Sequence, residues 1–119
     1  FNRKEKKDHG EGGVIIGTPL KGRVLIVDDV ISAGTSVNES VNLILEEGAK
    51  PSGISISIDR EEKGTGLLSA VEEIKETHHL PVCHLTSLQE IMRYIEHHET
   101  YASHINAMRD YQKVYGIKA

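Results

Sequence analysis

Apolar and polar positions follow two different spacings along the chain. Val24 to Val27 is an unbroken apolar run with the length of a strand buried on both faces. Between Ser36 and Glu47 apolar residues recur at helical spacing, and Gly48 then supplies a stop signal. The residues expected on the buried face of this helix are Val37, Val41, Ile44 and Leu45. The pattern therefore predicts a buried strand followed directly by an amphipathic helix.

The alternation of strand and helix repeats twice towards the C-terminus. Isoleucines alternate with serines over residues 54–58, and Pro81 to Leu85 is a third short apolar run, so both segments are predicted strands. A helix is predicted after each of them, and a last helix from about Tyr101 to Tyr115. Three predicted helix starts match the S-x-x-E capping box, at Ser36 with Glu39, Ser69 with Glu72 and Ser87 with Glu90.

Strands that alternate with helices predict an α/β fold. We expect an open, mainly parallel sheet flanked by helices and joined by right-handed crossovers. A length of 119 residues suits one domain. Residues 1–13 are charged and end in glycines, which predicts a flexible loop rather than an element with a buried face.

Composition narrows the class of protein. A formal net charge of -4 disfavours a protein that coats nucleic acid or a basic membrane-binding surface. Cys83 is the only cysteine, and its apolar, strand-like setting predicts a buried structural thiol in a reducing compartment. No apolar run reaches the roughly 18 to 20 residues that span a bilayer. These features favour a cytoplasmic enzyme that acts on small molecules.

Two adjacent carboxylates and a small, hydroxyl-rich turn follow the first predicted strand. The segment Val24 to Ser36 reads VLIVDDVISAGTS, and its turn lies at the end of a parallel strand, where open α/β sheets bind ligands. Asp28 and Asp29 are suited to accept hydrogen bonds from vicinal hydroxyls. Backbone N–H groups and hydroxyls between Ala33 and Ser36 are suited to bind a phosphate. The segment thus predicts a site for a phosphorylated sugar.

This segment resembles the phosphoribosyl pyrophosphate (PRPP) motif of the type I phosphoribosyltransferases. The resemblance implies the fold of that family, with Asp28 and Asp29 holding the ribose hydroxyls. It also implies that Mg²⁺ enters with PRPP and is bound through PRPP and water rather than by a cluster of protein ligands. The remaining residues of the motif, which are expected to surround the 5-phosphate, are Val30, Ile31, Ser32, Ala33, Gly34, Thr35 and Ser36.

The opening segment FNRKEKKDHGEGG resembles the mobile catalytic loop of bacterial orotate phosphoribosyltransferases. The resemblance implies that Arg3, Lys4 and Lys7 contact pyrophosphate and that His9 lies close to this leaving group. Cations aimed at the departing pyrophosphate stabilise the transition state, and a closing loop excludes water. In that family the loop reaches the neighbouring subunit's site, which implies a homodimer. By charge pattern alone, a solvated loop is the alternative.

A third segment, SIDREEKGTG at residues 57–66, resembles the part of the same family that presents an orotate-binding arginine. Arg60 directly follows a predicted strand, at the sheet edge that carries the PRPP motif. A guanidinium suits the carboxylate and carbonyl groups of a planar base. The resemblance implies that Arg60 contacts orotate with help from Ser32. The alternative is an arginine that pairs at the surface with Asp59, Glu61 or Glu62.

Together the three segments imply an orotate phosphoribosyltransferase, which makes orotidine 5'-phosphate and pyrophosphate from orotate and PRPP in pyrimidine (UMP) synthesis. Lys7, His9, Asp28 and Asp29 are the expected catalytic residues. The resemblance covers residues 1–119 as the C-terminal portion of one domain, with the catalytic loop at 1–13 and the PRPP motif at 24–36. We therefore expect apolar surface where the rest of the enzyme packs, and little or no activity from this chain alone.

Two alternatives share the PRPP motif: a type I phosphoribosyltransferase for a purine or uracil, and a non-catalytic PRPP-sensing regulator. The complete cationic loop disfavours the regulator, because a sensor has no need to stabilise departing pyrophosphate.

Several other patterns fit less well. A dinucleotide site is disfavoured because residues 64–69 lack the third glycine of the fingerprint, and an ATP-binding P-loop because no lysine follows Gly34. The paired histidines at 78–79 and 97–98 lack the i, i+4 spacing of a zinc site. A triad of Ser32, His9 and Asp29 has no nucleophile-elbow pattern. A receiver domain, with Asp59 as phosphate acceptor, lacks the later strand-end lysine.

Overall fold

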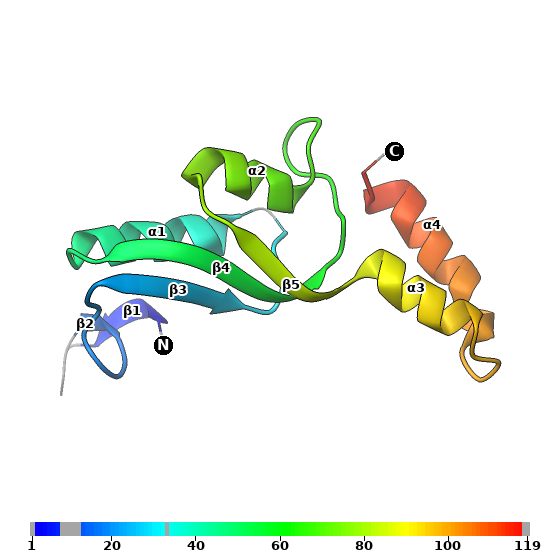
Figure 1. The fold of residues 1–119 in the computed structure, drawn as a ribbon, viewed down its shortest axis with the longest axis horizontal. Helices are drawn as coiled ribbons and strands as arrows, with labels where there is room; N and C mark the ends of the chain where they lie inside the picture. The colour runs from blue at the N-terminus through cyan, green and yellow to red at the C-terminus, as the bar shows by residue number, and fades with distance from the viewer. Residues whose placement is uncertain (1, 8–12, 33, 118–119) are drawn as a thin grey trace.

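The computed structural model describes residues 2–7, 13–32 and 34–117, and the side chains from Ile15 onwards within those ranges (Figure 1). Two strands, β1 (Asn2–Lys7) and β2 (Gly13–Ile15), precede the alternating part of the chain. The elements that follow are β3 (Arg23–Asp28), α1 (Thr35–Glu46), β4 (Lys50–Asp59), α2 (Ala70–His78), β5 (Val82–Ser87), α3 (Leu88–Glu96), a 3-10 turn η1 (Ala102–His104) and α4 (Ile105–Tyr115).

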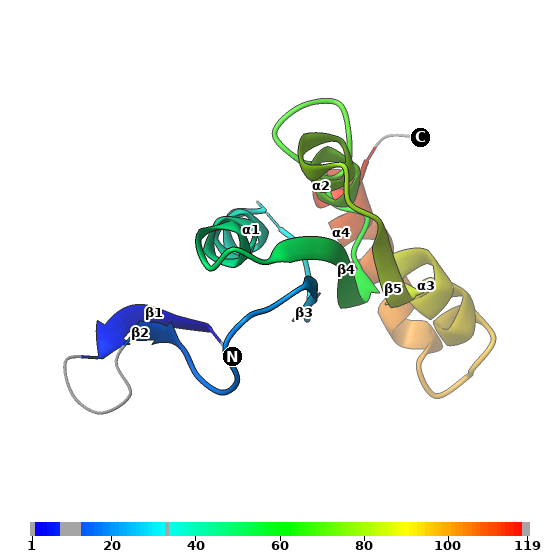
Figure 2. The same ribbon diagram turned by 60° about the vertical axis from the view of Figure 1, so that its left-hand side comes forward.

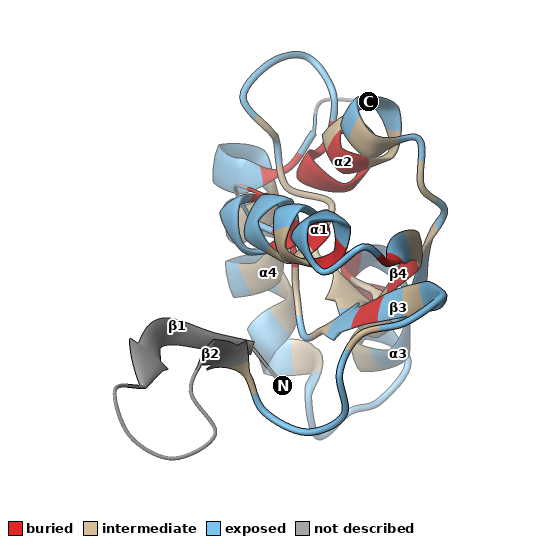
Figure 3. Cartoon of the chain, turned by 90° about the vertical axis from the view of Figure 1, so that its left-hand side faces the viewer, coloured by how far each residue is buried: buried red, intermediate tan, exposed pale blue. Residues whose placement is uncertain are grey.

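The central sheet is parallel, in the order β3-β4-β5, which confirms the predicted α/β class. Both crossover helices, α1 and α2, lie on the same side of it (Figure 1). Figure 3 shows that the buried positions gather on α1, α2 and the strands beneath them. The core is therefore one layer of side chains between the sheet and two helices, formed chiefly by Ile26, Val37, Val41, Ile44, Ile54, Ile56, Val71 and Ile74.

The other face of the sheet is open. Leu25 and Val27 on β3 are 54% and 74% exposed, and Leu85 on β5 is 83% exposed. The prediction that the first strand is buried on both faces is therefore wrong for this chain, because β3 is an edge strand with helices on one side only. Cys83 is exposed as well, so the prediction of a buried thiol is also wrong.

Helix α1 begins one residue earlier than predicted and without a capping box. Its N-cap is Gly34, and no side chain caps it, because the Ser36 hydroxyl donates instead to Asp28 Oδ2 at 3.2 Å. At the other end, Gly48 follows the helix in the left-handed conformation, with φ 77°, as a terminating glycine does. Leu45, predicted to be buried, is 56% exposed.

The other two capping boxes differ in completeness. At α3 both bonds form, with Ser87 Oγ accepting from Glu90 N and Glu90 reaching back to the Ser87 N–H. At α2 the Ser69 side chain accepts from Glu72 N. The Glu72 carboxylate does not return the bond but pairs with Lys75, at 3.0 Å. The serine of the second box therefore caps its helix alone.

The N-terminal segment is a hairpin, where a flexible loop was predicted over 1–13. β1 pairs with β2 in antiparallel register, from Asn2 opposite Ile15 to Lys7 opposite Gly13. Strand pairing uses backbone groups that every residue type carries, so a charged segment can form it without a buried face. Residues 8–12 lie outside the described residues. Figure 2 shows the hairpin projecting from the rest of the chain.

Candidate functional site

A concave pocket of about 380 Å³ lies where β3 ends and α1 begins. The elements on either side explain its position, since the chain leaves a parallel strand and enters a helix N-terminus there. Every described residue of the second part of the predicted PRPP motif, from Asp28 to Ser36, lines it. The lining residues are Asp28, Asp29, Val30, Ile31, Ser32, Gly34, Thr35, Ser36 and Val37, while Ala33 lies outside the described residues.

The helix end beneath the pocket has free backbone donors. Asn38 N–H bonds to the Gly34 carbonyl at 2.9 Å and so starts the helical ladder. The N–H groups of residues 35–37 precede this bond, and no side chain caps them. Together with the positive end of the helix dipole, they make the pocket floor suited to an anion such as a phosphate.

Gly34 allows this close turn. Its φ is +71°, and a Cβ built on it would lie 2.7 Å from Ile74 Cδ1 on α2. A side chain at this position would therefore meet both an unfavourable backbone conformation and a steric clash.

The two adjacent acids are held by short-range bonds. Asp28 Oδ1 accepts from the Asp29 N–H at 2.9 Å, and Asp29 Oδ1 accepts from the Val30 N–H at 2.7 Å. The Asp29 carbonyl also accepts from Ser57 N–H, at 2.9 Å, which ties the loop to β4. Both carboxylates thus line the pocket on an anchored backbone. Asp28 Oδ2 also accepts from the Ser36 hydroxyl, and the remaining lone pairs of the two carboxylates can accept from a ligand's hydroxyl groups.

Arg60 joins the second predicted segment to the first. It follows β4, and its Nη2 donates to Ser32 Oγ at 2.5 Å across 28 residues of sequence. Its Nε lies 3.2 Å from Glu62 Oε1. The structure therefore brings Arg60 to the PRPP loop, as the resemblance implied, and also pairs it with one of the neighbouring acids named in the alternative.

Glu62 has a further partner that no local sequence pattern predicts. The Tyr111 hydroxyl, on α4, donates a hydrogen bond to Glu62 Oε1. This bond, together with burial and the nearby Glu62 charge, raises the pKa of Tyr111 above its ordinary value of 10.0. The two residues are 49 apart in the sequence, and nothing in the local pattern around Tyr111 marks it as part of a site.

The candidate cationic residues occupy the hairpin. Arg3, Lys4 and Lys7 lie on β1, where the structure describes their backbone, whereas His9 and Glu11 lie outside the described residues. Figure 1 places this hairpin beside the N-terminal end of β3, away from the strand end that carries the pocket. Within one chain, the hairpin strands and the pocket are therefore apart.

The glycine-rich turn at 64–69 binds a carboxylate of its own chain. Glu73 Oε1 accepts from the Gly66 N–H at 2.8 Å and from the Thr65 hydroxyl at 3.1 Å. The backbone bonds at Thr65 and Gly66 lower the pKa of Glu73. These donors are used within the chain, so the turn does not have the arrangement of a dinucleotide-phosphate site.

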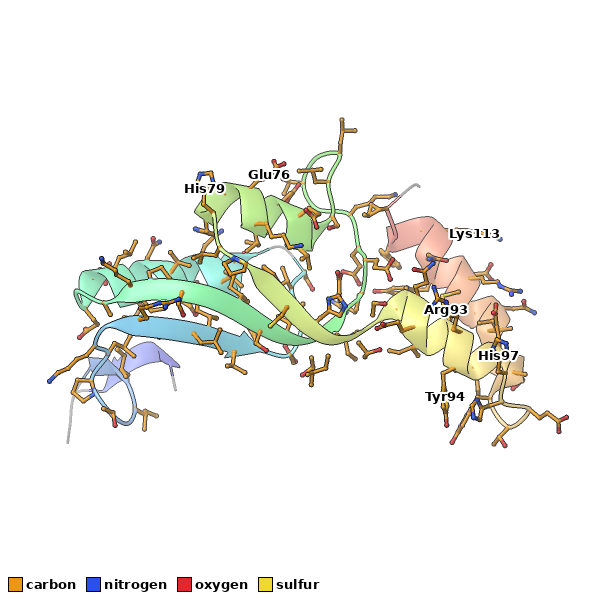
Figure 4. The ribbon with its side chains drawn as sticks, in the orientation of Figure 1. Glu76, His79, Arg93, Tyr94, His97 and Lys113 are labelled. Carbon is orange, nitrogen blue, oxygen red and sulfur yellow. The ribbon has the colours of Figure 1, made fainter. Side chains whose placement is uncertain are left out.

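The histidine pairs lie far from one another. Figure 4 shows His79 at the end of α2 and His97 at the end of α3, on opposite sides of the molecule. Within the described residues, no group of three or more His, Cys, Asp or Glu side chains is placed to hold a metal ion. No helix of the described ranges is long and apolar enough to cross a membrane.

Comparison with known proteins gives a consistent result. No protein-family model matches the chain. The orotate phosphoribosyltransferase of Chromobacterium violaceum is 53% identical over 117 residues, which are 98% of this chain and 55% of the relative. The enzymes of the same name from Neisseria meningitidis and Marinobacter nauticus are 52% and 48% identical, again over 55% of their own length. The chain thus spans about half the length of the curated relatives it matches.

Solved structures agree with the sequences. The crystal structure of orotate phosphoribosyltransferase from Francisella tularensis matches with a TM-score of 0.64 at 35% identity, over 79% of this chain and 46% of that one. The enzyme from Aeropyrum pernix matches with a TM-score of 0.58 at 29% identity, over 78% of this chain and 49% of that one. In sequence and in fold, the chain is similar to these orotate phosphoribosyltransferases over about half of their length.

Proposed function

We propose that the full-length protein is an orotate phosphoribosyltransferase and that this chain carries its PRPP site. The observation that carries the proposal is the contact between Arg60 and Ser32, at 2.5 Å, which places a guanidinium beside a pocket built from the PRPP motif. A sugar-phosphate site and an anion-binding side chain are what the transfer of phosphoribose to an acidic base requires. The named relatives support the same reaction.

In this proposal the pocket binds the ribose ring and the 5-phosphate of PRPP. Asp28 and Asp29 accept hydrogen bonds from the ribose hydroxyls, and their charge favours the positive charge that develops at the anomeric carbon. The uncapped N–H groups at the start of α1, with the Thr35 hydroxyl, donate to the 5-phosphate. The sugar is therefore held while its bond to pyrophosphate breaks and a bond to the base nitrogen forms.

Mg²⁺ fits this site as a companion of PRPP. The ion prefers hard oxygen donors, which the phosphate and hydroxyl oxygens of PRPP and water would supply, while the adjacent carboxylates of Asp28 and Asp29 in the pocket lining add favourable negative charge nearby. When bound, the ion would neutralise charge on the departing pyrophosphate. The chain's own contribution is to hold the ribose and the 5-phosphate in place.

Arg60 is the proposed orotate contact. Its guanidinium forms a planar fork that matches a carboxylate or a pair of carbonyl oxygens, and one-third of its side chain is exposed. The bond to Ser32 keeps the fork at the pocket edge until a base arrives. In this proposal Arg60 selects an acidic pyrimidine over a purine.

The hairpin is the proposed source of the pyrophosphate contacts Arg3, Lys4, Lys7 and His9. Since its strands lie away from the pocket of the same chain, we propose that it serves the pocket of a second subunit in a homodimer. We further propose that the enzyme acts in the cytoplasm and that residues 1–119 are part of one larger folded domain, whose other part covers the open face of the sheet.

A substrate panel tests the proposed function. The full-length protein is assayed at steady state with Mg²⁺ and PRPP and with orotate, hypoxanthine, guanine or uracil. We expect release of pyrophosphate with orotate alone. Turnover with a purine or uracil but not with orotate would show a different base specificity, and PRPP binding without turnover of any base would show a regulator.

A further inference from the structure

The segment that follows Arg60 is fixed to the C-terminal helix rather than to the rest of the sheet. Lys63 N–H donates to the Tyr115 carbonyl at 2.8 Å, and Ile117 N–H donates to the Glu61 carbonyl at 3.0 Å. Glu62 and Gly116 form an antiparallel bridge between these two bonds. The end of α4 therefore acts as a short strand beside residues 61–63.

The turn between Arg60 and this bridge is held from two more sides. Glu61 adopts a left-handed conformation, with φ 53°, which is unfavourable for a residue with a side chain. Asp59 Oδ1 accepts from the Glu61 N–H at 2.9 Å, and Glu61 Oε1 accepts from the Gln89 N–H at 3.0 Å. Such a conformation persists where the surroundings determine it, so the direction of the chain at Arg60 is fixed.

Side chains continue this connection into the pocket. The Tyr111 hydroxyl donates to Glu62 Oε1, the same oxygen lies 3.2 Å from Arg60 Nε, and Arg60 Nη2 donates to Ser32. The Glu62 side chain is only 15% exposed, so water screens its charge weakly. A continuous line of polar contacts thus runs from α4 to the PRPP loop.

We propose that Glu62, held by Tyr111, is a positioning residue that sets the orientation of the Arg60 guanidinium for orotate. The inference deepens the proposed function and rests on it, because the role of Arg60 toward orotate belongs to that proposal. An arginine side chain has many rotamers, and a fixed carboxylate at Nε limits them, while Nη1 and the second N–H of Nη2, beyond the bond to Ser32, stay available. Helix α4 thereby contributes to base binding without lining the pocket.

The contact between Glu62 and Arg60 Nε is an ion pair rather than an aligned hydrogen bond. Arg60 Nε is buried and makes no hydrogen bond of good geometry, although the Glu62 oxygen is within ion-pair distance. On its other side, Glu62 Oε1 accepts a hydrogen bond from the Tyr111 hydroxyl, and this bond raises the pKa of Tyr111.

Four variants of the full-length protein test the inference: Glu62→Ala, Glu62→Gln, Tyr111→Phe and the control Tyr115→Phe. Tyr115 lies one turn further along α4, with its ring 4.8 Å from that of Tyr111 and 54% exposed. The Gln variant keeps an acceptor for Tyr111 but lacks the charge that faces Arg60. The measurements are kcat, KM for orotate, KM for PRPP and the melting temperature of each variant.

We expect Glu62→Ala to raise KM for orotate about tenfold, because it removes a charged partner of the arginine. Tyr111→Phe should raise the same constant by about threefold, since Glu62 stays but is held less firmly. The KM for orotate of Glu62→Gln should lie between the values of Glu62→Ala and the wild type. KM for PRPP should stay within about twofold in all of them, and Tyr115→Phe should match the wild type.

An unchanged KM for orotate in Glu62→Gln and Tyr111→Phe, or an equal rise in both KM values, would overturn the inference. A purely structural role would lower the melting temperature and the amount of active enzyme while leaving both KM values as they were. If Glu62→Ala does not fold, the KM values for orotate of Tyr111→Phe and Glu62→Gln, each compared with the wild type, still test the inference. Wild-type protein without orotate turnover would overturn the proposed function as well, whereas an active wild type with unaffected variants overturns the inference alone.

Discussion

Gly34 determines the shape of the proposed phosphate site more directly than any charged residue in it. It combines a left-handed backbone, with φ +71°, and a Cβ position only 2.7 Å from Ile74 Cδ1. The isoleucine belongs to the core cluster and is 4% exposed, so it has little room to move. The turn that opens the pocket and the core beneath it therefore depend on the same absence of a side chain.

Gly34→Ala should destabilise the protein and weaken PRPP binding. The control Gly48→Ala separates the cost of the left-handed backbone from the cost of the clash with Ile74. Gly48 has a similar φ of +77° with nothing within 4 Å of the Cβ position, so it carries the backbone cost alone. We expect Gly34→Ala to cost about 1–3 kcal/mol more than Gly48→Ala in chemical unfolding. Adding Ile74→Val, which removes Cδ1, should recover part of that difference. An equal loss of unfolding free energy in Gly34→Ala and Gly48→Ala would show that the clash with Ile74 is unimportant.

For single residues of the candidate site, the sequence identified those that belong to a local motif and missed those that reach the site only through the packing of distant elements. Asp28 and Asp29 are adjacent and follow a strand, and Arg60 follows another, so strand ends placed them together. Tyr111 reaches Glu62 through the packing of α4 against residues 61–63, and this packing leaves no trace in local spacing. The acid that pairs with Arg60 was one of three neighbours, and only the three-dimensional turn at Glu61 selects Glu62.

The helix starts illustrate how one sequence pattern leads to different structures. Ser36, Ser69 and Ser87 all begin an S-x-x-E pattern, yet only Ser87 forms the complete box. The Ser36 hydroxyl is taken by Asp28, and the helix begins before it, so the first turn of α1 keeps its donors free. The departure from the expected cap occurs at the proposed phosphate site, where uncapped N–H groups have a use.

Ser87→Ala should lower stability by about 1 kcal/mol, because it removes a helix cap, whereas Ser36→Ala should cost clearly less. The effect at Ser87 also has a pH dependence. The Glu90 carboxylate accepts from the Ser87 N–H and the Thr86 hydroxyl, and these bonds lower its pKa below the usual 4.5. A lowered pKa gives stability that is present above the usual value and is lost as pH falls through the lowered one.

Thermal unfolding of Ser87→Ala, Ser36→Ala and Glu90→Gln between pH 7 and pH 3 measures these effects. The melting temperature of the wild type should exceed that of Glu90→Gln at pH 7. This difference should disappear as the pH falls below about 4.5, because the native carboxylate then takes up a proton. The description of the two helix starts would be contradicted if the difference in melting temperature between the wild type and Glu90→Gln stayed constant over this range. It would also be contradicted if Ser36→Ala lowered the melting temperature more than Ser87→Ala does.

The whole molecule is extended for its length. Its radius of gyration is 17.4 Å, against about 13.5 Å for a compact domain of this size. The sheet has helices on one face, while Leu25, Val27 and Leu85 are exposed on its strands. The sequence predicted a fully buried first strand because the apolar run fits a sheet covered on both sides, whereas the helices among the described residues cover one side only. These features support the proposal that the chain belongs to a larger folded domain.

The central claim is that the pocket between β3 and α1 binds PRPP, and direct titration of PRPP with Mg²⁺ into the full-length protein tests it. We compare the wild type with the double variant Asp28→Asn/Asp29→Asn and with Asp110→Asn, whose carboxylate is exposed on α4. The double variant should bind PRPP roughly a hundredfold more weakly, because two charged acceptors for the ribose hydroxyls are lost. Asp110→Asn should bind as the wild type does. Unchanged PRPP affinity in the double variant would contradict the claim.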